Sequence, residues 1–329
     1  MEQVRLDIDP FVNDPGRWAH SLANLAEIMV PCLDAAGARS VVEVGAYAGD
    51  LTSVLVEWAA GCGARVWAID PSPQDRLARL EEERDELELV RETSLRALPR
   101  LPLADAVIID GDHNHHTVSE ELRLIDERVG DGDLPLLMFH DVCWPHGRRD
   151  DYFAPELIPE DQRQPIAEGG GLHPDEAGIR AGGLPYRAAA VREGGPRNGV
   201  LTAVEDYVAD REGLRLAIVP AFFGLGVVWH RDAPWADAVA EVLEPWDRNP
   251  LLERLEGNRV FHLAESHFQL VQAANALHRK RRQEAVLKRL LASSAFSFAE
   301  RLSRLRARMG IAADKSVVSK DEIRRSLSD

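Results

Sequence analysis

The chain has 329 residues, 45% of them hydrophobic, so a sizeable core can form and global disorder is not expected. Its formal net charge of −16 argues against a general nucleic-acid binder, because phosphate contacts need a basic face. Three cysteines without motif spacing indicate a reducing compartment and no disulfide framework. Because the polar first residues lack a signal-peptide core and no apolar run reaches the roughly 18 residues of a membrane span, we expect a cytoplasmic protein.

Predicted strands and helices alternate through the first half of the chain. A helix with one apolar face is expected over 17–36, and Gly37 closes it. The elements that follow are strand 40–44, helix 50–60, strand 65–70, helix 74–86, strand 87–90, strand 105–110, helix 116–129 and strand 135–139. Strands that are apolar throughout predict an α/β fold: a Rossmann-like, doubly wound, mostly parallel sheet with helices on both faces.

Residues 145–199 interrupt this alternation because they are dense in glycine and proline. A segment of this length without predicted elements is typical of a functional lid or a disordered insertion, and its glycines would let it open and close. A helix over 200–211 and strands over 214–219 and 225–230 then complete the sheet. We therefore expect one domain over residues 1–233 with an insertion at 145–199.

The composition changes after Pro234, and residues 234–311 are expected to form a helical extension, followed by a disordered tail over 312–329. The segment from Arg279 to Arg308 contains ten Lys or Arg and two acidic residues, which gives a local net charge of +8. The extension has three interpretations: an oligomerisation helix, a helix on an anionic membrane surface, or a solvated segment. Its apolar stripe favours a homo-oligomer, with peripheral membrane contact as the alternative.

A glycine-containing loop follows the first predicted strand and reads Glu43-Val44-Gly45-Ala46-Tyr47-Ala48-Gly49. Gly45 and Gly49 allow the backbone to turn sharply, and the next helix offers free N–H groups to a carboxylate. The loop is not G-x-G-x-x-G, which disfavours a dinucleotide pyrophosphate. Asp70 ends the second strand, where a carboxylate can accept both hydroxyls of a ribose. The alternative is a tight turn with a surface carboxylate.

Acids and histidines follow the fourth and fifth strands, as Asp110-Gly111-Asp112-His113-Asn114-His115-His116 and His140-Asp141. These side chains should converge, and such clusters form divalent metal sites or general acid–base pairs. A cation bound by Asp110, His140 and Asp141 would take a substrate hydroxyl as a ligand and lower its pKa. His113 would then accept the proton, since the ordinary pKa of histidine lies near neutrality. The alternative is a metal-free site in which Asp110 orders the loops and His113 is the sole base.

The motif Glu43-x-Gly45-x-Tyr47-x-Gly49 resembles the first motif of class I S-adenosylmethionine (SAM)-dependent methyltransferases, particularly the metal-dependent O-methyltransferases, which carry an aromatic residue at the middle position. The resemblance covers about residues 17–230. It implies that Asp70 binds the SAM ribose and that Thr93 and Ser94 lie along the adenine, with Asp110 also beside the cofactor. The residues that it assigns to the methionine moiety are Glu43, Gly45, Ala46, Tyr47 and Gly49.

In the same family one Asp follows the fourth strand and an Asp-Asn pair follows the fifth. Asp110 matches the first position and His140-Asp141 the pair, with a His in place of the first acid. The metal would then be bound more weakly, be a softer ion such as Mn or Fe, or be absent. Asp-Gly-Asp-His with His-Asp is most similar to a bacterial subgroup of natural-product and sugar methyltransferases and relatives of cephalosporin hydroxylase-type proteins.

The resemblance implies O-methylation of a hydroxyl on a sugar, glycan or specialised metabolite, with SAM and Mg²⁺ or another divalent metal as cofactors. The segment from Leu290 to Leu305 resembles tails of enzymes in surface-polysaccharide pathways, which favours a glycan acceptor. Two alternatives remain, since a fold does not fix the chemistry. One is a metal-dependent hydroxylase-like enzyme of the same fold, and the other is a non-catalytic SAM-binding partner subunit.

Overall fold

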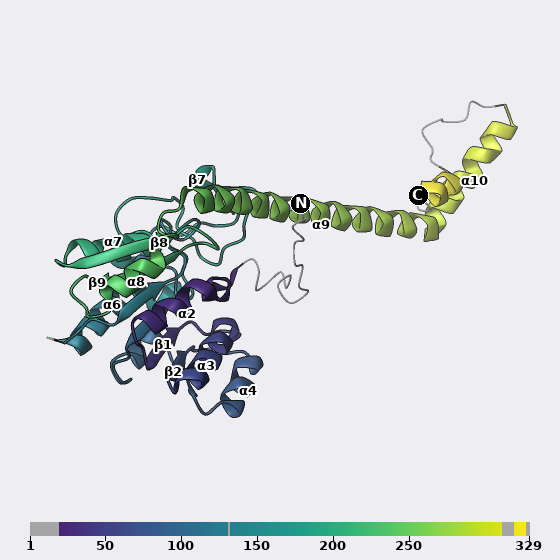
Figure 1. Ribbon diagram of the computed structural model, residues 1–329. Coiled ribbons are helices and arrows are strands. Elements are labelled where there is room, and N and C mark those ends of the chain that lie inside the picture. Colours follow the sequence, from purple (N-terminus) through teal and green to yellow (C-terminus); the bar gives the residue numbers. More distant parts are fainter. Residues whose placement is uncertain (1–19, 131, 311–318, 327–329) are drawn as a thin grey trace, which may run out of the picture. The chain divides into compact units, whose positions relative to one another are not determined.

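Figure 1 shows the protein as a computed structural model that describes residues 20–130, 132–310 and 319–326. The chain forms two compact units, Met1–Glu265 and Ser266–Asp329. None of the described helices combines the length and the hydropathy needed to cross a membrane. The start of the helix expected over 17–36 and most of the tail expected over 312–329 lie outside the described residues.

Seven strands of the first unit form one sheet in the order β3-β2-β1-β4-β5-β9-β8. Neighbouring strands among β1 to β5 pair in parallel, whereas β9 is antiparallel to both β5 and β8. The chain order reverses between β1 and β4, the point beyond which doubly wound sheets bind their ligands. The strands are β1 Ser40–Val44, β2 Arg65–Ile69, β3 Leu87–Val90, β4 Ala106–Ile109, β5 Leu136–Phe139, β8 Leu214–Val219 and β9 Leu225–His230.

Helices cover both faces of this sheet, so the first unit has three layers (Figure 1). Val41 of β1 packs in the core on one face and its neighbour Val42 in the core on the other, because successive strand residues point to opposite sides. The helices on the Val41 side are α2 Ala26–Ala35, α3 Asp50–Cys62, α4 Asp75–Glu83 and α8 Ala236–Leu243. Those on the Val42 side are α5 Ser94–Ala97, α6 His115–Val129 and α7 Val200–Ala209.

The Rossmann-like fold predicted from the sequence is present, and the predicted β8 and β9 have the observed bounds. Within the range 17–36 expected to be one helix, the described residues form the 3-10 helix η1 Leu22–Leu25, where the Ser21 side chain accepts a hydrogen bond from the Ala23 N–H, and then α2. The first compact unit extends past residue 233 to Glu265 and includes the start of α9 Pro250–Ala292. Part of the tail expected to be disordered is the helix α11 Lys320–Ser326, which follows α10 Ser294–Arg308.

Residues 145–199, expected to be a lid or a disordered insertion, are folded into the first unit. They contain η2 Pro155–Leu157, η3 Glu160–Gln162 and a hairpin of β6 Gly171–His173 and β7 Glu176–Arg180. Asp150 is fully buried and accepts hydrogen bonds from the backbone N–H groups of His115 and Gly199 and from the Tyr152 hydroxyl. The expectation of disorder is therefore wrong, while opening and closing of this segment stays a prediction.

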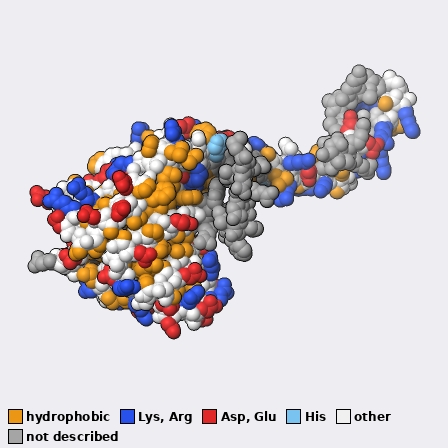
Figure 2. Space-filling view, viewed as in Figure 1, with side chains coloured by type: hydrophobic (Ala, Val, Ile, Leu, Met, Phe, Trp, Pro, Cys, Tyr) orange, Lys and Arg blue, Asp and Glu red, His pale blue; other side chains and the backbone are white. Residues whose placement is uncertain are grey.

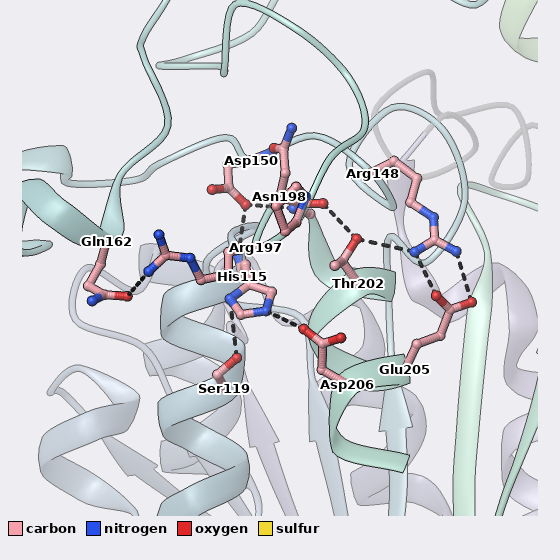
Figure 3. Close-up of polar contacts among 12 residues, drawn as sticks. His115, Ser119, Arg148, Asp150, Gln162, Arg197, Asn198, Thr202, Glu205 and Asp206 are labelled. Carbon is pink, nitrogen blue, oxygen red and sulfur yellow. Dashed lines mark hydrogen bonds and ion pairs between the residues drawn. The ribbon is translucent and has the colours of Figure 1, made fainter. Parts of the chain in front are cut away.

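Polar contacts join residues 145–199 to the helices beside them (Figure 3). Arg148 donates to Glu205 and Thr202 of α7. The ring of His115, at the start of α6, lies 2.9 Å from the Asp206 carboxylate of α7. The contacts of Arg148 attach the start of the segment to α7, and the contact between His115 and Asp206 joins α6 to α7.

Candidate active site

The loop after β1 and the loop after β4 touch through their backbones. Gly45 has φ +88°, and a side chain there would place its Cβ 2.0 Å from the Asp110 carbonyl oxygen. The Gly45 N–H donates to the Ile69 carbonyl at 2.9 Å, which ties the same loop to β2. Gly49 has φ +79° and precedes α3 without a side-chain cap, so the first N–H groups of α3 are available to a ligand. Only glycine fits at Gly45.

Asp70, predicted to bind a ribose, shapes the loop after β1. Its Oδ2 accepts the Tyr47 backbone N–H at 2.8 Å, and its Oδ1 accepts the Ser72 N–H at 2.7 Å. Each carboxylate oxygen has a second lone pair, so hydroxyl groups can still donate to Asp70. The Tyr47 side chain is 60% exposed. The structure thus holds Tyr47 next to Asp70 through a backbone contact.

Glu43 is a buried carboxyl group at the centre of this loop region. Its Oε2 has no hydrogen-bond partner among the described residues, which is rare for a buried polar atom. The pKa of Glu43 is raised to about 8, mainly by burial, with Thr52 acting against this shift and the nearby Asp110 and Asp70 adding to it. A cationic ligand such as the ammonium group of a methionine moiety would satisfy this oxygen. Among the predicted adenine contacts, Ser94 is buried and Thr93 is half-buried at the start of α5.

Four of the predicted acid and histidine side chains converge, whereas Asp112 instead accepts hydrogen bonds from the Thr117 hydroxyl and the Phe153 N–H. His140 Nδ1 lies 2.9 Å from Asp110 Oδ1 and 3.2 Å from Asp141 Oδ2. His113 Nε2 lies 3.1 Å from Asp141 Oδ2 and 3.7 Å from Asp110 Oδ1. On its other side, His140 Nε2 lies 2.8 Å from the Phe222 carbonyl oxygen. Because a carbonyl only accepts hydrogen bonds, this nitrogen carries a hydrogen.

The cluster balances its own charges. Burial alone would lower the pKa of both histidines, but Asp110 and Asp141 raise the pKa of His140 well above its ordinary value and that of His113 to about 9. Burial would raise the pKa of Asp141, yet His140 and His113 hold it below its usual range. At neutral pH His113 therefore carries a proton, whereas the predicted base must be neutral. Its role as proton acceptor stays a prediction that requires the two carboxylates to be engaged elsewhere.

The donor set also fits a divalent cation. One ligand atom each from Asp110, His140 and Asp141 lies within 4.8 Å of the other two. The separations of 2.9 and 3.2 Å are close to the ~3 Å between adjacent ligands of an octahedral cation with bonds of about 2.1 Å. The Nε2–H bond to the Phe222 carbonyl is the outer contact that metal-binding histidines usually make. A cation would have to displace the proton on Nδ1.

His146 and the Phe222 carbonyl also belong to this region. The His146 ring stacks on His113 with centroids 4.9 Å apart, and its Nδ1 is buried without a partner among the described residues. Burial and the adjacent His113 lower the pKa of His146 to about 4, so its ring is neutral at pH 7. His146 lies in the glycine-rich segment and Phe222 in the turn between β8 and β9, and neither carries a motif. His115, by contrast, faces Asp206, away from the cluster.

Residues 42–142 match the family model of a methyltransferase domain. The matched part runs from β1 to the residue after Asp141 and therefore contains both the loop after β1 and the acid–histidine cluster. No curated protein sequence matches the chain. The similarity to a methyltransferase domain therefore covers the residues of the candidate site.

Solved methyltransferase structures are also similar to this chain. A Podospora anserina methyltransferase with bound SAH is 13% identical, with 68% of this chain and 84% of that one covered and a TM-score of 0.41. A putative caffeoyl-CoA O-methyltransferase from Staphylococcus aureus is 10% identical, with 67% and 97% covered and a TM-score of 0.38. The cofactor-bound protein Rv0187 from MTB is 17% identical, with 67% and 91% covered and a TM-score of 0.35. Because these scores are low, the fold assignment rests on the strand order itself.

Proposed function

We propose that this protein is a SAM-dependent O-methyltransferase that methylates a hydroxyl of a sugar, glycan or specialised metabolite. The observation that carries the proposal is the contact between Gly45 and the Asp110 carbonyl. It places the loop that would hold SAM directly against the cluster that would activate the acceptor. Similarity of residues 42–142 to a methyltransferase domain supports the same assignment.

The residues around the loop after β1 suit the parts of SAM. The unpartnered Glu43 Oε2 would accept a hydrogen bond from the amino group, and the first N–H groups of α3 would bind the carboxylate. Asp70 would accept hydrogen bonds from the ribose through its remaining lone pairs. The absence of a side chain at Gly45 lets the loop after β4 pack directly against the loop after β1.

The acid–histidine cluster would hold the acceptor, and with Asp110 and Asp141 engaged by a cation, His113 would take up the acceptor's proton. When bound, SAM would supply an electrophilic methyl group, and a divalent cation would lower the pKa of the acceptor hydroxyl. Asp110 and Asp141 provide the negative charge that such a cation requires, and the Phe222 carbonyl fixes the orientation of the His140 ring. In a metal-free site, His113 remains protonated beside the two carboxylates and orients an acceptor oxygen by donating a hydrogen bond.

The experiment is a binding and transfer assay on the full chain. The chain is titrated by calorimetry with SAM and with NAD, each with and without Mg²⁺ or Mn²⁺. We expect it to bind SAM and not NAD. Transfer of a labelled methyl group to hydroxylated acceptors such as sugars and phenols then tests catalysis. Asp110→Asn is expected to lower transfer at least tenfold, while Asp206→Asn, whose exposed side chain contacts His115 outside the cluster, is the matched control.

Other outcomes separate the alternatives. Binding of NAD in place of SAM contradicts the proposal. SAM binding without transfer to any hydroxylated acceptor indicates the partner-subunit alternative. A tightly bound metal with activity that does not depend on SAM indicates the hydroxylase-like alternative.

A further inference from the structure

The helix α10 Ser294–Arg308 of the second unit exposes a continuous apolar stripe. Phe298, Leu302, Leu305 and Met309 are spaced by four, three and four residues, so they share one face of the helix. These four side chains are between 47 and 70% exposed. Ordered apolar side chains in such a row are costly to leave in water and mark a contact surface.

Arginines border this stripe on both sides. At 3.6 residues per turn, Arg301 and Arg308 lie roughly 70–90° from the centre of the stripe in one direction, and Arg306 lies roughly 70° away in the other. Within α10 the single acidic residue is Glu300, on the opposite face, and it pairs with Arg304. Among the residues of α10 itself, the border of the stripe is therefore purely basic.

The second unit differs in charge from the rest of the protein. Residues 266–329 contain fourteen Lys or Arg and six Asp or Glu, a net charge of +8, whereas the whole chain carries −16 and residues 1–265 therefore carry −24. Figure 2 shows Lys and Arg side chains gathered along the C-terminal helices, with hydrophobic ones among them. Positive charge is thus concentrated where the exposed stripe lies.

The charge pattern decides between a second copy of this helix and a lipid surface. Two copies of α10 packed stripe to stripe would bring arginine borders together without acidic partners, and charges beside such a seam usually pair with opposite ones. An anionic bilayer supplies both an apolar interior for the stripe and negative headgroups for its borders. We propose that α10 binds flat on the surface of an anionic membrane.

In this arrangement the stripe enters the boundary between headgroups and acyl chains, while Arg301, Arg306 and Arg308 contact lipid phosphates. The binding would bring residues 1–265, the part with the proposed methyltransferase site, to a membrane surface. It does not depend on that activity, because the residues of α10 lie outside the site.

The test is co-sedimentation of the full chain with vesicles of phosphatidylcholine alone or mixed with phosphatidylglycerol. Binding is expected only to the anionic vesicles and is expected to weaken as salt is added, because salt screens the arginines. Arg301→Gln and Arg308→Gln should each weaken binding about fivefold. Leu302→Ser should weaken it about tenfold or more, since it removes a leucine from the apolar layer.

The matched control is Ala307→Ser, which adds the same side chain on the exposed opposite face of α10 and should change binding less than twofold. Circular dichroism should show the same helix content in both variants, because both positions are exposed. Equal binding to neutral and anionic vesicles, no binding to either, or unchanged binding of Leu302→Ser overturns the proposal. A dimer in light scattering that Leu302→Ser dissociates would assign the stripe to a second copy and would also overturn it.

Discussion

His140 donates its Nε2–H to the carbonyl oxygen of Phe222 across 2.8 Å. This contact leaves Nδ1 as the nitrogen that faces Asp110 and Asp141. With a hydrogen on Nδ1, the ring is a cation held between two carboxylates. Without it, the same nitrogen offers a lone pair to a metal ion, and the orientation of the ring does not change.

Metal binding should therefore release a proton. Because Asp110 and Asp141 raise the pKa of His140 well above its ordinary value, a divalent cation must displace the Nδ1 proton at neutral pH. We expect the affinity for Mn²⁺ to rise by up to about tenfold per pH unit between pH 6 and 8. Calorimetry in buffers of different ionisation enthalpy counts the released protons, and the expected number is about one. An affinity that does not change with pH would show that the cation binds elsewhere.

Gly45→Ala should disrupt both the loop after β1 and SAM binding. The new Cβ would lie 2.0 Å from the Asp110 carbonyl oxygen, so the loops after β1 and β4 must separate. We expect a loss of about 3 kcal/mol or more in the free energy of unfolding, measured by urea denaturation, and no detectable SAM binding. Gly37→Ala is the control, because Gly37 also has a positive φ but a Cβ added there would meet no atom within 4 Å. That variant should lose only about 1 kcal/mol and keep SAM binding.

Glu43 and Glu121 form a matched pair of buried acids. Burial raises the pKa of each to about 8, and each has unpartnered carboxyl oxygens among the described residues. Such a group binds its proton more tightly in the folded chain, so the fold loses stability as pH rises from about 4.5 toward 8. Replacing either by Gln should remove part of this loss and stabilise the protein by roughly 1–3 kcal/mol at pH 7.

The two variants should differ in cofactor binding. Glu43 lies in β1, next to the loop proposed to hold SAM, whereas Glu121 lies on α6 beside Ser94 and Asp112. We expect Glu43→Gln to weaken SAM binding about tenfold in calorimetry, and Glu121→Gln to leave it within about twofold. Equal SAM affinity in both variants would remove Glu43 from the proposed cofactor site.

The sheet could be predicted from the sequence because its strands are short apolar runs, and β1, β2 and β4 are followed directly by a glycine or an acidic residue. The convergence of Asp110 and His140 followed from the same pattern, since parallel strands end at one edge. The electrostatic environment of these side chains could not be predicted from the sequence. The pKa of His113 depends on two carboxylates at distances of 3.1 and 3.7 Å, and no spacing in the sequence encodes those distances.

The structure of the glycine-rich segment 145–199 differs most from what the sequence predicts. Its glycines and prolines predict few regular elements, and the order comes from single buried polar residues that no periodic pattern reveals. Asp150 and Asn198 are examples, because their side chains bind backbone groups far apart in the chain. His146 lies in this segment, so its stacking on His113 could not be predicted either.

Asp150→Ala should loosen the whole segment 145–199. The substitution removes the acceptor of the His115 and Gly199 N–H groups and of the Tyr152 hydroxyl, all in a buried setting. We expect a loss of about 2–5 kcal/mol in the free energy of unfolding, together with faster proteolysis within residues 145–199. Methyl transfer should fall as well, because the adjacent Asp151 N–H donates to the His113 carbonyl at 2.9 Å.

Asp206→Ala is the control for this prediction, since Asp206 also contacts His115, but through the ring and with 61% of its side chain exposed (Figure 3). An exposed pair of this kind contributes about 0–1 kcal/mol, so this variant should unfold and be cleaved much like the wild type. The contrast isolates the buried contacts of Asp150 from the surface contact of the same histidine. If the two variants have equal stability and equal cleavage rates, the order of residues 145–199 does not depend on Asp150, and His146 and His113 are held together by other contacts.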